Sequence, residues 1–114
     1  MIARPETRLL LQADTPIPNG QTVTVVAAFD TTDFSKIIGV LRADQALTVN
    51  IYQSSGIDDT NMETVTQESV NADTSEGGGI AFDLPIAGAH ARIDAVNASG
   101  TDATLRAYVA MKSL

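Results

Sequence analysis

One acidic cluster has the side chains of a cation-binding loop. Asp58 and Asp59 are adjacent, and Glu63 follows shortly after them. Carboxylate oxygens are the ligands that calcium prefers, but an EF-hand loop also has a central glycine and a distal glutamate, which this cluster lacks. Asp58 and Asp59 are therefore calcium candidates without a recognised loop motif, and we expect no resident metal or cofactor.

Few other residues of the chain could act in catalysis. His90 is the single histidine, and no Gly-x-Ser-x-Gly motif supplies a serine nucleophile beside it. Paired carboxylates act in glycoside hydrolysis, but a sugar-cleaving site also calls for aromatic platforms, and the chain has 2 Tyr, 3 Phe and no Trp. The absence of cysteine excludes thiolate catalysis and cysteine-ligated zinc. We predict that the chain is not an enzyme.

Length and charge restrict the partners. At 114 residues the chain is expected to form one domain over residues 1–114. Its formal net charge is −7, and its 7 basic residues are scattered along the sequence. Nucleic-acid binding depends on clustered Lys and Arg, so no nucleic-acid partner is expected. No apolar run is long enough for a signal peptide or a membrane span, so we expect neither.

The elements that must position any site are strands. Residues in the run Ala46–Gln53 alternate strictly between apolar and polar, which is typical of a strand with one buried face. A stretch of turn formers and a second alternating run, Met62–Val70, complete a hairpin. The longest alternation lies in Thr101–Lys112, whose predicted core residues are Ala103, Leu105, Ala107, Val109 and Met111.

Short apolar runs bounded by Pro, Gly, Asn and Asp predict the other strands. Leu9 and Leu11 are the expected core residues of the first strand, and Asp14–Gly20 is expected to be a loop because it holds two prolines. The last two strands are expected to pair. Arg92 and Arg106 are expected either to pair with Asp94 across the sheet or to form a salt bridge with a partner. The expected strands are Thr7–Ala13, Gln21–Phe29, Phe34–Arg42, Ala46–Gln53, Met62–Val70, Ile80–Leu84, Ala89–Asn97 and Thr101–Lys112.

About eight short strands without a convincing helix indicate an all-β fold. The architecture we expect is a single antiparallel β-sandwich of jelly-roll type. Cores of this kind suit the composition, because the chain is 44% apolar but only 4% aromatic.

Two stretches resemble the small β-sandwich proteins of tailed-phage virions. One is Leu47–Gly56, followed by an Asp- and Asn-rich loop and Met62–Val65; the other is Ala91–Asn97 with a glycine turn and then Ala103–Val109. In those proteins a strand ending in Gln-Ser precedes an Asp-Gly-Thr-Asn-Trp loop. Here Met62 stands where that Trp is usual. The similarity covers residues 34–112.

The resemblance implies a structural role in a bacteriophage virion. A chain of this size suits a capsid decoration (cement) protein, made in the host cytoplasm, that binds the major capsid protein on the outer head surface and associates as a homotrimer. The alternative is a receptor- or carbohydrate-binding domain of a head or tail fibre, which a groove with an exposed tyrosine would favour. The interaction candidates are Ile2, Arg4 and Pro5 in an N-terminal arm (residues 1–8), and Ala87, Ala89 and Ala91 at a symmetry axis.

Overall fold

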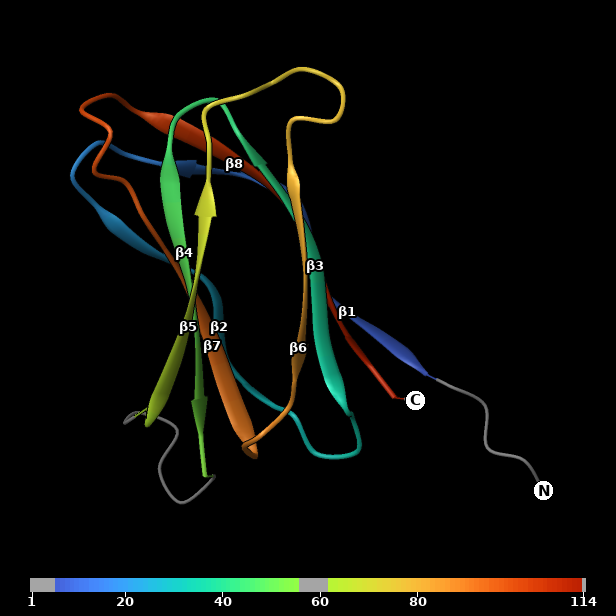
Figure 1. The fold of residues 1–114 in the computed structure, drawn as a ribbon. Coiled ribbons are helices and arrows are strands. Elements are labelled where there is room, and N and C mark those ends of the chain that lie inside the picture. Colours follow the sequence, from blue (N-terminus) through green and yellow to red (C-terminus); the bar gives the residue numbers. More distant parts are fainter. Residues whose placement is uncertain (1–5, 56–61, 114) are drawn as a thin grey trace.

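The computed structural model describes residues 6–55 and 62–113, and all of its regular elements are strands (Figure 1). No helix in this part of the chain is long and apolar enough to cross a membrane. The strands are β1 (Thr7–Ile17), β2 (Thr22–Asp30), β3 (Lys36–Ala43), β4 (Leu47–Ser54), β5 (Thr64–Val70), β6 (Ile80–Pro85), β7 (His90–Val96) and β8 (Ala103–Lys112).

The eight strands form two four-stranded sheets that face each other (Figure 1). One sheet has the order β1-β8-β3-β6 and the other β2-β7-β4-β5, and each strand pairing is antiparallel. The chain crosses between the sheets repeatedly, so most strands that are consecutive in sequence lie in different sheets. This strand order is that of a jelly roll. The predicted antiparallel sandwich of about eight strands is therefore confirmed.

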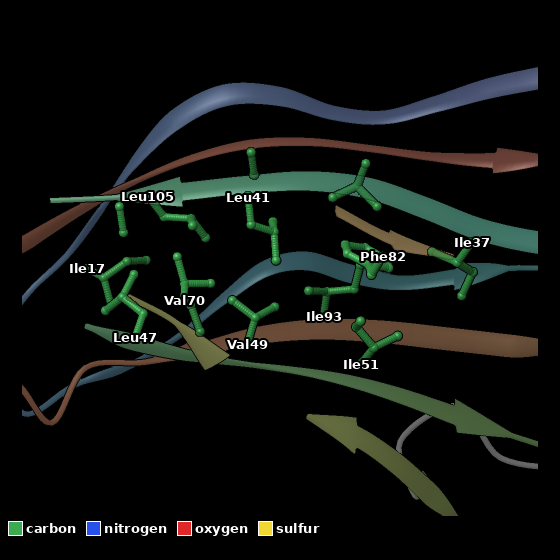
Figure 2. Packing of buried hydrophobic residues seen from close by; sticks show 14 of the residues in the cluster. Ile17, Ile37, Leu41, Leu47, Val49, Ile51, Val70, Phe82, Ile93 and Leu105 are labelled. Atoms are coloured by element: carbon green, nitrogen blue, oxygen red, sulfur yellow. The ribbon is translucent and has the colours of Figure 1, made fainter. Parts of the chain in front are cut away.

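The core lies between the sheets and is almost entirely aliphatic (Figure 2). Strand β8 supplies the five residues that its alternation predicts, and each of them is buried. The predicted hairpin is also present, because β4 pairs with β5 in regular register. The largest side chains of the core are Ile17, Ile37, Leu41, Leu47, Ile51, Phe82, Ile93, Leu105 and Met111.

A glycine in the middle of β3 makes room for the one aromatic ring buried in this core. Gly39 pairs with Phe82 of β6 and Val109 of β8. A Cβ atom on Gly39 would collide with the Phe82 ring and would lie 2.8 Å from the Tyr108 carbonyl oxygen. Gly39 is thus needed for close packing, which is a common reason for glycine inside a strand.

Three local predictions are wrong. Leu9 is 52% exposed, because the register shifts between Leu9 and Leu11 and turns Leu9 to the outer side of the sheet. Strand β1 continues through Pro16 to Ile17 instead of ending before a loop; β1 is an edge strand, where the missing N–H of proline costs no ladder hydrogen bond.

The third wrong prediction is the pairing of the last two strands. Strand β7 pairs with β2 and β4, whereas β8 pairs with β1 and β3, so the connection between them crosses from one sheet to the other. The side chain of Asn97 makes the hydrogen bonds that fix this connection between the sheets. Its Nδ2 donates to the carbonyl oxygens of Ile17 and Thr101, both at 2.8 Å, and its Oδ1 accepts from the Ser99 amide at 3.0 Å.

Candidate functional site

The outer side of the β1-β8-β3-β6 sheet combines exposed apolar and basic side chains, and we call it the basic face. Strand alternation turns every second residue of β3 and β8 away from the core. The basic face is made of Leu9, Gln12 and Asp14 of β1, Lys36, Ile38, Val40 and Arg42 of β3, Ala81 and Asp83 of β6, and Arg106, Tyr108, Ala110 and Lys112 of β8.

Four of the chain's 7 basic residues lie on this face, although the chain as a whole has a net charge of −7. Arg42 is directly opposite Arg106, and Lys36 is directly opposite Lys112. Like charges directly opposite one another on neighbouring strands destabilise a sheet. One cation of each opposed pair has a carboxylate partner on the same face: Lys36 Nζ lies 3.2 Å from Asp83 Oδ2, and Arg106 Nε lies 3.1 Å from Asp14 Oδ1.

Apolar surface is also concentrated here. Leu9 is 52% and Val40 53% exposed, and both lie on the basic face. Leu9 is level with Ala110 and Ile38, and Val40 is level with Tyr108 and Ala81. Ala110 is fully buried and Asp83 ends the first of these rows, so the exposed apolar surface comes mainly from Leu9 and Val40. Exposed apolar surface rimmed by charges is typical of an interaction site.

The face is hollowed over β8 and β3. An open hollow of about 750 Å³ lies between Gln12 of β1, Tyr108 of β8, Val40 of β3 and the glycine loop that ends at Gly79, and we call it the arginine groove because Arg42 and Arg106 line it. A second hollow of about 250 Å³ adjoins the same two arginines on the side of Asp44 and Thr104. The two arginines therefore stand between two surface depressions.

The two arginines differ in their partners. Arg106 Nε donates to Asp14 Oδ1 at 3.1 Å, and this hydrogen bond raises the pKa of the Arg106 guanidinium. Arg42 has no carboxylate partner in the described part of the chain. Its NH1 group donates to the Ser75 carbonyl oxygen at 3.4 Å, which is a long hydrogen bond. A carboxyl group also lies near Arg42: hydrogen bonds from the Ser75 hydroxyl and amide lower the pKa of Asp73, and the positive charge of Arg42 lowers it further.

The outer side of the other sheet is polar, and among the described residues it holds buried polar atoms without a hydrogen-bond partner: Asn50 Oδ1, Ser54 Oγ, His90 Nδ1, Arg92 Nε and Asp94 Oδ1. Strands β4 and β7 place Asn50 opposite Asp94, Tyr52 opposite Arg92, and Ser54 opposite His90. Arg92 lies 4.6 Å from the centre of the Tyr52 ring, and its Nε is 3.3 Å from Asp94 Oδ1. Asp94 thus pairs with its own strand neighbour rather than across the sheet, and the predicted contact with Arg106 is wrong.

Five of the candidates named from the sequence lie outside the residues that the structure describes: Ile2, Arg4, Pro5, Asp58 and Asp59. Within residues 6–55 and 62–113, no three His, Asp or Glu side chains stand close enough together to hold a metal ion.

The three predicted interface alanines do not share one exposed face. Ala91 is fully buried in the core, Ala89 is half-buried and Ala87 is exposed. Gln53 fixes the segment before β7, because its Oε1 accepts from the amides of Ala87 at 2.7 Å and Gly88 at 3.2 Å. The burial of Ala91 removes it from the proposed face, while self-association itself stays a prediction.

The arginine groove was not predicted from the sequence. Alternation alone turns Val40 and Arg42 to the same side of β3, which was a usable signal. The position of Arg106 and Asp14 beside Arg42 depends on the pairing of β8 with both β1 and β3. No local pattern in the sequence encodes that pairing.

The fold defines this chain as an antiparallel jelly-roll sandwich. No protein-family model and no curated protein matches the sequence. Among solved structures, the chain is similar to the crystal structure of PBSX exported protein XepA, with a TM-score of 0.68 and 17% sequence identity. The match covers 91% of this chain and 36% of that one, so the present chain spans about a third of the length of XepA. At this identity, the likeness shows a shared fold.

Proposed function

We propose that this chain is a structural protein of a bacteriophage virion, and more closely a decoration protein that binds the outer surface of the head. The observation that carries the proposal is the basic face, which is apolar, basic and hollowed on a chain that is otherwise acidic. The fold it shares with PBSX exported protein XepA, a phage-related protein, supports the association with phage.

The face suits docking on a large surface. Its exposed apolar residues Leu9 and Val40 supply area to be buried. Its four basic residues, two of which have a carboxylate partner on the face, supply charge complementarity to an acidic partner. We place the major capsid protein in that role. Binding by a homotrimer would add the contacts of three copies, so individually weak contacts would give tight overall attachment.

The experiment uses heads of the phage that encodes this chain, prepared without it. Purified protein is added and the heads are sedimented, and the temperature at which they release DNA is recorded. The proposal predicts saturable co-sedimentation and a higher release temperature. A variant with Val40→Asp and Arg42→Glu on the basic face should lose both effects, whereas Val65→Asp, at an exposed position of β5 in the other sheet, should retain them. Free protein that stays in the supernatant at every concentration contradicts the proposal.

A second candidate is a receptor- or carbohydrate-binding domain of a phage fibre. The specific observation in its favour is that Tyr108 lines the arginine groove, because aromatic rings are common platforms for sugars. The short span of the match to XepA also fits a module of a larger assembly. Binding of the purified chain to immobilised host-surface glycans, lost in Tyr108→Ala, would support this function. Failure of every such glycan to bind would leave the decoration role as the better account.

A further inference from the structure

In the described part of the chain, one group of polar side chains is buried without being hydrogen bonded. It lies on the outer side of the β2-β7-β4-β5 sheet, where strand alternation turns side chains away from the core. We call it the polar centre, and it is made of Asn50, Tyr52 and Ser54 of β4 and His90, Arg92 and Asp94 of β7. Ser54 is 2%, Asp94 6% and Asn50 8% exposed, although this side of a sheet is normally solvated.

The other buried polar side chains of the described residues behave differently. They are Thr31, Gln53 and Asn97, and each of them is hydrogen bonded to backbone atoms. All of the buried side-chain atoms without a partner belong instead to the polar centre. Buried polar atoms are nearly always bonded, so a group of exceptions at one place indicates a partner from outside the chain.

The charges of the polar centre favour a neutral partner. Arg92 Nε lies 3.3 Å from Asp94 Oδ1, but the two atoms do not form a hydrogen bond. The guanidinium group disfavours a metal cation beside Asp94, and the carboxylate disfavours an anion beside Arg92. The ligand is therefore expected to carry hydrogen-bonding groups but no net charge.

The unpartnered atoms include acceptors and a donor. Asp94 Oδ1 and Asn50 Oδ1 accept hydrogen bonds, and Arg92 Nε donates one. A hydroxyl group serves both kinds of atom, and Tyr52 adds an aromatic ring directly opposite Arg92. A protein partner would need apolar area, but Val65 is the only large exposed apolar residue described on this sheet. A saccharide supplies several hydroxyl groups and needs little apolar area.

We propose that the polar centre binds a neutral saccharide, with neighbouring hydroxyl groups donating to Asp94 and Asn50 and accepting from Arg92. Arg92 gives the ligand access. Its side chain is 29% exposed, lies 4.6 Å from the centre of the Tyr52 ring and reaches along β7 to Asp94. Because Arg92 Nε makes no hydrogen bond, an outward movement of this side chain breaks none there and uncovers Asp94 Oδ1.

The inference goes beyond the proposed function and is compatible with it. The two sheets face each other, so their outer sides point in opposite directions (Figure 1). A chain docked through the basic face would therefore present the polar centre away from the head, toward glycans outside the particle. This orientation rests on the proposed function, whereas the site itself does not.

The test titrates isotope-labelled chain with the methyl glycosides of glucose, galactose, mannose and N-acetylglucosamine. Each is taken to about 100 mM, because a single sugar unit offers few contacts and binds weakly. Backbone amide resonances and the Nε–H resonance of Arg92 are followed. We expect saturable shifts with at least one glycoside, confined to residues 50–54 and 90–94 and including the Arg92 Nε–H.

Variants of the chain assign the contact. Asp94→Asn keeps the size of the side chain and removes its charge, so it should weaken the bound glycoside about fivefold or more. Glu76→Gln removes a carboxylate from an exposed position between β5 and β6, and it should leave the affinity unchanged.

A second measurement tests the premise without a ligand. Ser54→Ala removes a buried hydroxyl that has no partner, so it should keep or raise the melting temperature. A fall of more than about 5 °C would show that this hydroxyl is bonded within the free chain, and it would remove the premise.

The other outcomes of the titration overturn the proposal. No saturable shift with any of the glycosides means that water alone satisfies the polar centre. Shifts at residues 40–42 and 106–108 instead would place the sugar in the arginine groove. Full affinity in Asp94→Asn would exclude the carboxylate as a contact.

The proposed function fails separately from this inference, because head binding is measured without sugar. Protein that binds heads but no glycoside loses only the saccharide site. Protein that binds a glycoside at the polar centre but ignores heads loses only the decoration role.

Discussion

Replacement of Asn97 by Ala tests how the two sheets are joined. Asn97 is 1% exposed, and its side chain joins the end of β7 to Ile17, at the end of β1 in the other sheet, and to Thr101 in the loop before β8. Without it, the carbonyl oxygen of fully buried Ile17 loses its side-chain donor at 2.8 Å, which costs about 1–3 kcal/mol. Thr101 is exposed, so water replaces the second hydrogen bond at a cost of about 0.5–1 kcal/mol.

The expected loss for Asn97→Ala is therefore about 1.5–4 kcal/mol of unfolding free energy, which corresponds to a fall in melting temperature of roughly 5–20 °C. Urea unfolding followed by circular dichroism measures the loss, because the chain has no Trp for fluorescence. The slope of the unfolding free energy against urea concentration should not change, because the surface exposed on unfolding stays the same.

Two variants separate the role of Asn97 from that of its turn. Ser99→Ala removes a part-buried hydrogen bond to Asn97 Oδ1 and an exposed one to the Thr101 carbonyl oxygen, but it leaves the buried bond from Asn97 to Ile17, so it should cost about 1 kcal/mol and less than Asn97→Ala. Asn97→Asp keeps the acceptor but turns a carboxylate toward two carbonyl oxygens, so near neutral pH it should be at least as destabilising as Asn97→Ala. A loss under about 0.5 kcal/mol for Asn97→Ala, or a wild-type-like Asn97→Asp, would refute the reasoning.

Three further predictions concern single elements of the sandwich. Ile37→Ala should cost about 2–5 kcal/mol in urea unfolding because the residue is fully buried, whereas Val40→Ala on the same strand should cost under about 0.5 kcal/mol, and similar losses for the two would contradict the assigned faces. Gly39→Ala should lower the melting temperature through its collision with the neighbouring ring and carbonyl; an unchanged value would show that this close approach is wrong. Hydrogen bonds from the Thr32 hydroxyl and amide lower the pKa of Asp30, so Thr32→Val should raise it in an NMR titration. Because the folded-state pKa is lowered, the stabilisation by Asp30 is present above its unfolded pKa and is lost as pH falls through the folded value; an unshifted pKa in Thr32→Val would exclude the hydroxyl as its cause.

Most of the strands were predictable because side-chain alternation is a local property of the backbone. The period of two residues identified the buried set of β8 and the β4–β5 hairpin without any knowledge of their neighbours. Leu9 was misplaced because a single bulge reverses the faces of the residues before it. A bulge at this position has no marker in the sequence, since Leu9, Leu10 and Leu11 are identical.

Long-range pairing was the part that the sequence did not predict. The turn Asn97–Gly100 resembles a hairpin connection, yet it carries the chain from one sheet to the other. That crossing separates β7 from β8 and brings Arg106 beside Arg42 instead of Asp94. Every residue pair in the arginine groove depends on this arrangement, so the groove was visible only in the structure.

The central claim is that the basic face docks on a phage head, and the two lysines of the chain provide the most direct test. Lys36 and Lys112 are the only lysines in the sequence, and both lie on this face. Acetylation of free and head-bound protein with a water-soluble reagent, read by mass spectrometry, therefore reports on one surface alone. The account predicts that both lysines react several-fold more slowly in the bound protein. Head-bound protein with unchanged acetylation rates at both lysines would contradict it.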